Sequence, residues 1–248
     1  MPLNLFKRAA LPETTIIALS LGEVAVRVRA SNRARAYRLA ISSRGEPVLT
    51  VPQGGRWSEA RAFLLRHAGW LEARLARLPR PAPLAHGGTI PLRGVPHRIV
   101  SLAGSRGTVR IHHGADGPEL HVPGGPDHLQ RRLTDWLKRE ARADLEGACA
   151  RHAATLGVRI AALRLRDQST RWGSCSSARA LNFNWRLILA PPFVLDYVAA
   201  HEVAHIIEMN HAPAFWRTVG RALPDYEAGR AWLKANGREL MQVGAGSV

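Results

Sequence analysis

The sequence contains few cysteines and no long apolar run, and each absence excludes a class of protein. Cys149 and Cys175 are the only cysteines among 248 residues, which excludes a secreted domain held together by several disulfides. No stretch reaches the 18 apolar residues typical of a transmembrane helix, and the short apolar segment 16–19 is not followed by a cleavage pattern. The sequence therefore predicts a soluble, cytoplasmic protein that has reduced thiols and no membrane partner.

Lysine is also scarce, although the formal net charge is +16. The first 125 residues contain 18 Lys and Arg against 7 Asp and Glu, so most of the excess charge is N-terminal. Two explanations stay open: a compositional bias towards arginine, or a surface that binds nucleic acid or another polyanion. A group of arginines on a predicted strand, turn and strand favours phosphate binding: Arg27, Arg29, Arg33, Arg35 and Arg38.

The hydrophobic pattern is mainly strand-like in the first half of the chain and helix-like in the second. Short alternating or apolar runs between glycines and prolines predict strands up to residue 123, interrupted by one amphipathic helix over 57–78 and a proline-rich connector at 79–83. No internal repeat is visible. We expect an α+β protein in which residues 1–125 form a mostly antiparallel β domain with one helix. Residues 126–248 should form a mostly α domain with a short sheet.

The most specific motif is His-Glu-x-x-His at residues 201–205. On a helix, His201 and His205 project from the same face about 6 Å apart, so that both can bind one metal ion. Pro191 and Pro192 suit the start of this helix, which we expect to run from about 193 to 208. Asn210 is then expected to act as a left-handed C-cap and to turn the chain back towards the histidines.

His211 and Glu202 complete the predicted site. Catalytic zinc sites typically use three protein ligands and leave a further position open, which predicts Zn²⁺ held by His201, His205 and His211. Glu202 is turned by about 100° from His201 around the helix, so its carboxylate can act as a general base on a water molecule. The motif therefore predicts a zinc-dependent metallohydrolase, and we expect residues 126–248 to have a zincin-like fold.

The residues around this motif resemble the YgjP-like metallopeptidase-domain family, which is grouped with the SprT-like and WLM zinc proteins. The matching segments nearest the motif are Arg171-Trp172-Gly173-Ser174-Cys175-Ser176, Asn184-Trp185-Arg186-Leu187, Asp196-Tyr197-Val198 and Asn210-His211-x-x-x-Phe215-Trp216. Further matches are Ser43-Arg44-Gly45, Val51-Pro52, Trp70-Leu71, Pro224-Asp225-Tyr226 and Trp232-Leu233. The resemblance thus covers most of the chain. It implies that the three histidines bind metal and that Glu202 is the catalytic residue.

The substrate stays open between three alternatives. Peptide hydrolysis is the first choice, while the resemblance also implies a nucleoside triphosphate pyrophosphatase or a nucleic-acid-associated SprT-like protein. A strand predicted over 181–189 would place Asn184 and Arg186 beside the cleft, and these two residues and Arg171 are the candidate substrate-binding residues. His112 and His113, adjacent on another predicted strand, point to opposite sides and are expected to be surface residues.

Overall fold

The computed structural model describes residues 11–42, 45–77 and 84–244, and the chain divides into two compact units, residues 1–79 and 80–248. Strands and helices confirm the predicted α+β class. The proline-rich connector at 79–83 lies outside the described residues. Within the described ranges, no helix combines the length and apolar character needed to cross a membrane. Both cysteines are free.

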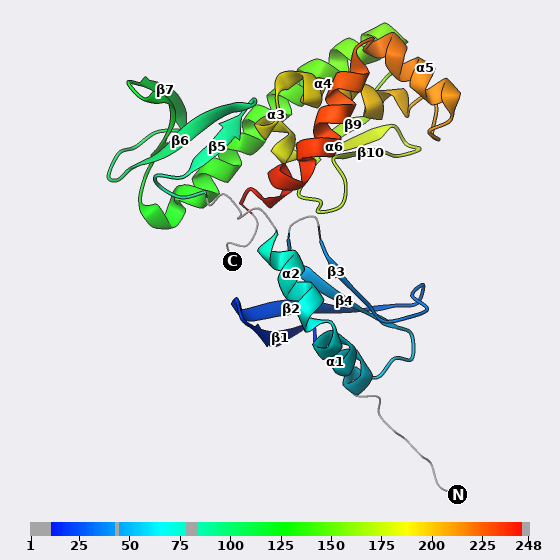
Figure 1. Ribbon diagram of the computed structural model, residues 1–248. Coiled ribbons are helices and arrows are strands. Elements are labelled where there is room, and N and C mark those ends of the chain that lie inside the picture. The colour runs from blue at the N-terminus through cyan, green and yellow to red at the C-terminus, as the bar shows by residue number, and fades with distance from the viewer. Residues whose placement is uncertain (1–10, 43–44, 78–83, 245–248) are drawn as a thin grey trace, which may run out of the picture. The chain divides into compact units, whose positions relative to one another are not determined.

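The first unit is a four-stranded sheet with two helices on one face (Figure 1). Its strands are β1 (Thr14–Leu19), β2 (Gly22–Ser31), β3 (Arg38–Ile41) and β4 (Pro47–Pro52). The order is β1-β2-β4-β3, in which β2 and β4 are parallel and the other two pairs are antiparallel. Val26 and Val28 face the core while Arg27 and Arg29 are exposed, as the alternation of a half-buried strand requires.

The single helix predicted over 57–78 is wrong, because the chain forms α1 (Trp57–Arg66) and α2 (Ala68–Ala76). His67 leaves the helical region at φ −103° and ψ 13°, and its Nδ1 lies 2.9 Å from the carbonyl oxygen of Phe63. The bend allows Leu64 in α1 and Leu71 in α2 to be buried in the same core.

The second unit begins with a sheet of the same topology. Its strands are β5 (Thr89–Leu92), β6 (Val95–Leu102), β7 (Arg110–Gly114) and β8 (Gly117–Pro123). Their order is β5-β6-β8-β7, again with a parallel central pair and antiparallel outer pairs. A helix follows this sheet too: α3 (Pro126–Leu156). The two units therefore share a strand order that no sequence repeat indicates.

This second sheet belongs with the C-terminal half, so the structural division does not coincide with the expected boundary between 125 and 126. Ile99 and Leu120 share one hydrophobic cluster with Trp185 and with several residues of α3. The turn after β5 also bonds to the C-terminal half, because Arg93 N donates to the carbonyl of Ile188 over 2.7 Å. Apolar runs and turn residues predict strands but do not indicate which core the strands will join.

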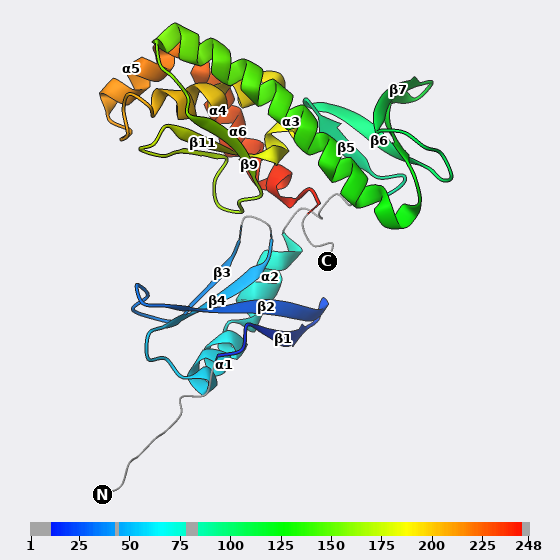
Figure 2. The same cartoon turned by 180° about the vertical axis from the view of Figure 1, so that it is seen from behind.

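The rest of the second unit combines a three-stranded sheet with helices. Figure 2 shows α3 running past this sheet and these helices. The elements are β9 (Ala162–Arg166), β10 (Gly173–Cys175), β11 (Ala180–Asn184), the 3-10 helix η1 (Trp185–Leu189), α4 (Pro192–Ala204), α5 (Pro213–Ala222) and α6 (Tyr226–Gln242). The strand order is β10-β11-β9, so β10 is an edge strand. The strand predicted over 181–189 is wrong beyond Asn184, whose Oδ1 accepts a hydrogen bond from Arg186 N and starts η1.

Candidate metal centre

α4 carries the first two histidines of the predicted site near its C-terminal end. It starts at Pro192 as expected but ends at Ala204, before the predicted residue 208, and His205 is its C-cap. Asn210 is not among the non-glycine residues with positive φ, so the predicted left-handed C-cap is wrong. Instead, Asn210 Oδ1 accepts a hydrogen bond from Ala212 N over 3.1 Å. This side-chain turn redirects the chain before α5 starts at Pro213.

The structure brings His201, His205 and His211 together. One ligand nitrogen from each lies within 4.8 Å of the others, and the Nε2 atoms of His201 and His211 are 3.1 Å apart. Nitrogens bound to one tetrahedral zinc at 2.0–2.1 Å are separated by about 3.3 Å, so this arrangement has the size that zinc requires. His205 Nδ1 lies 2.9 Å from the carbonyl oxygen of Glu208, and donation to this oxygen leaves Nε2 with a lone pair for a metal.

An aromatic ring lies against all three histidines. Phe215 on α5 stacks on His205 with ring centroids 4.4 Å apart, and contacts His201 and His211 edge-on at 4.8 Å each. Phe215 is fully buried, so it limits the movement of the three imidazoles. Phe215 has no place in the predicted ligand set, although it is four positions after His211 and close to the start of a helix.

Burial favours the neutral form of two of the imidazoles, those of His201 and His205. It lowers the pKa of His201 to about 3, with the neighbouring His205 and His211 acting in the same direction. Burial also lowers the pKa of His205. Neutral imidazoles are the form that binds metal ions. His201 Nδ1 is itself buried without a hydrogen-bond partner among the described residues.

Glu202 lies beside the histidines in a tight pocket against β10. It is 5% exposed, and its Oε2 is buried with no hydrogen-bond partner in the described ranges. A Cβ atom added to Gly173 would lie only 2.4 Å from Glu202 Oε1, so glycine is needed where β10 passes the carboxylate. Burial raises the pKa of Glu202 to about 8, while the nearby charge of Arg171 acts in the opposite direction.

The three candidate substrate-binding residues lie in different surroundings. Arg171 is exposed and close enough to affect Glu202. Asn184 and Arg186 are buried, which corrects the expectation that they face the cleft. Arg186 Nε donates to the carbonyl of Val243 over 2.8 Å, and its guanidinium pairs with Asp167. Asn184 donates to the carbonyl of Gln168 over 2.6 Å. Both residues therefore connect segments of the interior.

β10 is the strand that leaves an unpaired edge beside the metal helix. Trp172 O accepts from Asn184 N over 2.8 Å and Ser176 N donates to Ala180 O over 3.0 Å, so the backbone groups of these residues point towards β11. Antiparallel strands alternate, which means that the N–H and C=O groups of Gly173 and Cys175 point away from β11. Among the described strands β10 pairs with β11 alone, so the residues beside Glu202 present outward backbone groups.

The basic group identified in the sequence lies in the first unit. A single open pocket is lined by four of its members: Arg29, Arg33, Arg35 and Arg38. Arg27 pairs with Glu46 at 3.7 Å, whereas none of the four pocket arginines pairs with a carboxylate within the described ranges. Arg29 and Arg38 flank Thr50 in register on the exposed face of the sheet.

Comparisons with known proteins identify the family of this chain. The model of the YgjP-like family, described as a metallopeptidase domain, matches residues 35–236. None of the curated proteins matches the chain. One similar solved structure is the metallopeptidase zymogen abylysin of Pyrococcus abyssi, with 17% identity and a TM-score of 0.35. The similarity covers 37% of this chain and 93% of that chain.

Proposed function

This chain belongs to the YgjP-like metallopeptidase-domain family, and we propose that it is a zinc-dependent peptidase with Glu202 as its general base. The supporting observation is that three histidines converge beside a buried carboxylate oxygen that has no other partner within the described residues. His201, His205 and His211 would hold the metal. When bound, zinc supplies a Lewis acid that polarises a carbonyl group and makes water more acidic.

Glu202 would move the proton. Its Oε2 accepts a proton from the attacking water and then returns it to the leaving amine. Burial gives this carboxylate a pKa of about 8 without a nearby divalent cation, and such a cation would lower that pKa by favouring the charged form. The charged form of Glu202, which such a cation favours, is the form that accepts a proton as a general base. Phe215 would keep the imidazoles in position during this transfer.

An extended peptide would bind along the free edge of β10. The outward backbone groups of Gly173 and Cys175 can pair with a substrate strand and would bring its carbonyl group towards Glu202. Cys175→Pro tests this binding mode, because proline removes one outward N–H but no bond to β11. We expect KM for peptides to rise about tenfold or more, with zinc content unchanged. Cys175→Ala keeps the N–H and is the matched control; equal KM values in the two variants would exclude pairing at this edge.

A second candidate is hydrolysis of nucleoside triphosphates. The observation that favours it is Arg171, an exposed cation close to Glu202 that could contact a phosphate. The test is to incubate zinc-loaded protein with a peptide library and a nucleotide panel, each with and without DNA. Cleavage of peptides alone supports the peptidase, and release of pyrophosphate or phosphate supports the alternative. Peptide cleavage that requires DNA would support the nucleic-acid-associated function.

A further inference from the structure

A second histidine–carboxylate cluster lies on the sheet β5–β8, away from α4. It consists of His112 on β7 with Glu119 and His121 on β8, and one ligand atom of each lies within 4.8 Å of the others. Glu119 and His121 are two residues apart on one strand, so both point to the same face, and His112 lies directly opposite Glu119. Leu120 between them is fully buried, which places the cluster on the outer face.

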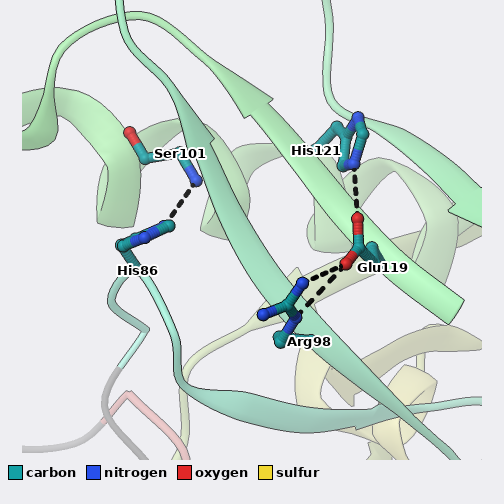
Figure 3. Close-up of polar contacts among 5 residues, drawn as sticks. All are labelled: His86, Arg98, Ser101, Glu119 and His121. Atoms are coloured by element: carbon teal, nitrogen blue, oxygen red, sulfur yellow. Dashed lines mark hydrogen bonds and ion pairs between the residues drawn. The ribbon is translucent and has the colours of Figure 1, made fainter. Parts of the chain in front are cut away.

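The polar contacts orient this cluster. Figure 3 shows Glu119 between Arg98 and His121, with one carboxylate oxygen directed at each. Arg98 donates to Glu119 Oε1 from Nη2 over 2.5 Å and from Nε over 3.2 Å. His121 Nε2 lies 2.7 Å from Glu119 Oε2, and the rings of His112 and His121 are 4.5 Å apart. Arg98 thus holds the Glu119 carboxylate next to the two histidines.

One nitrogen of the cluster is left without a protein partner. Donation from His121 Nε2 to Glu119 leaves a lone pair on Nδ1, and Nδ1 is buried with no hydrogen bond within the described ranges. A buried polar atom without a partner is unfavourable unless something outside the protein satisfies it. Imidazoles such as those of His112 and His121 are ligands that suit zinc and related transition ions. A carboxylate that orients a ligand histidine is also a common feature of such sites.

We propose that His112, Glu119 and His121 form a second site for a divalent transition-metal ion, Zn²⁺ being the probe of choice. The ion would connect β7 to β8. β7 is an edge strand that pairs only with β8 among the described strands, and four of its five residues are exposed. Few other contacts stabilise such a strand, so an ion bridging His112 and His121 would stabilise the hairpin. This site does not depend on the function proposed for α4.

The test measures zinc bound by the full chain after equilibration and dialysis. The wild-type protein should bind two equivalents, and His112→Ala and His121→Ala should each bind one. His113→Ala is the matched control and should keep two, because His113 is adjacent to His112 but points to the opposite face. Glu119→Gln should weaken the second equivalent by about 10- to 100-fold, the usual effect of losing a carboxylate that supports a ligand.

A second background separates this site from the one on α4. The double variant His201→Ala/His205→Ala should still bind one zinc, and adding His121→Ala should remove it. Zinc should also slow hydrogen exchange at the β7 amides in the double variant but not in the triple variant. If the double variant binds no zinc while remaining folded, or if His121→Ala binds as much zinc as His113→Ala, the proposal is wrong.

Discussion

The two four-stranded sheets share a strand order but differ in the residues on their outer faces and in the helices that cover their inner faces. In the first unit, Arg29, Thr50 and Arg38 lie in one row across β2, β4 and β3. The corresponding row across β6, β8 and β7 is Val100, His121 and Arg110. Two arginines flank the central threonine in the first row, whereas the central His121 of the second row lies 2.7 Å from the carboxylate of Glu119. The same strand order therefore supports a cationic surface in one unit and a candidate metal site in the other.

The inner faces differ in what covers them. α1 and α2 complete a separate core in the first unit, while the second sheet shares its core with α3 and η1. α3 also packs against α4, which carries His201. We therefore expect that substitutions in the core of the second sheet affect the metal centre, whereas substitutions in the core of the first sheet affect only the first unit.

Truncating matched core residues should produce the largest difference between the sheets. Leu49 in β4 and Leu120 in β8 occupy corresponding positions and are both fully buried. Each change to alanine should lower the free energy of unfolding of its own unit by about 2–5 kcal/mol. Leu120→Ala should also reduce zinc retention and peptide hydrolysis under mild denaturant, while Leu49→Ala should leave both unchanged. Denaturant unfolding followed together with zinc release would show this, and equal zinc loss in the two variants would contradict the separation.

Removing the metal should affect one unit more than the other. A ligand present at a hundred times its dissociation constant stabilises the folded state by about 2.7 kcal/mol. A chelator should therefore shift the unfolding transition of the second unit to lower temperature and leave that of the first unit in place. Calorimetry with and without chelator measures both transitions. A shift of the first transition would mean that it also contains a metal ligand.

The smallest expected effect concerns the arginines. Replacing Arg29, Arg35 and Arg38 by glutamine should weaken binding of a short DNA or polyphosphate probe and flatten its salt dependence, because unpaired cations release counterions on binding. Arg98→Gln is the matched control in the second sheet and should change polyanion binding little, since Glu119 already neutralises Arg98. Salt titrations of both variants check this. If the triple variant and Arg98→Gln had equal effects, the arginine group would reflect the composition of the chain and not a polyanion-binding surface.

Much of the candidate site is predictable because its signals are local. His201 and His205 lie four residues apart, and the turn after α4 returns His211 to them over a short distance. The turn chemistry was harder to predict, since Asn210 can either adopt a left-handed backbone or accept a hydrogen bond from Ala212 N. The burial of Asn184 and Arg186 was not predictable. Over the five residues of η1, the alternation of side chains does not distinguish a strand from a 3-10 helix.

The parts that could not be predicted depend on contacts between distant residues. The two sheets share a strand order without a visible repeat in the sequence, because many different side chains produce the same alternation of apolar residues. The cluster on β7 and β8 depends on register, and the sequence does not show that His112 lies opposite Glu119. The break at His67 depends on how two helical segments reach one core.

In the proposed mechanism, Glu202 moves a proton beside a metal held by three histidines. Glu202→Gln keeps the size of the side chain but removes the base. The most direct test measures zinc content and peptide hydrolysis in the same preparation of this variant. We expect unchanged zinc and a rate reduced about 100-fold or more, the usual scale for general-base catalysis. A near-normal rate with full zinc would contradict the role of Glu202.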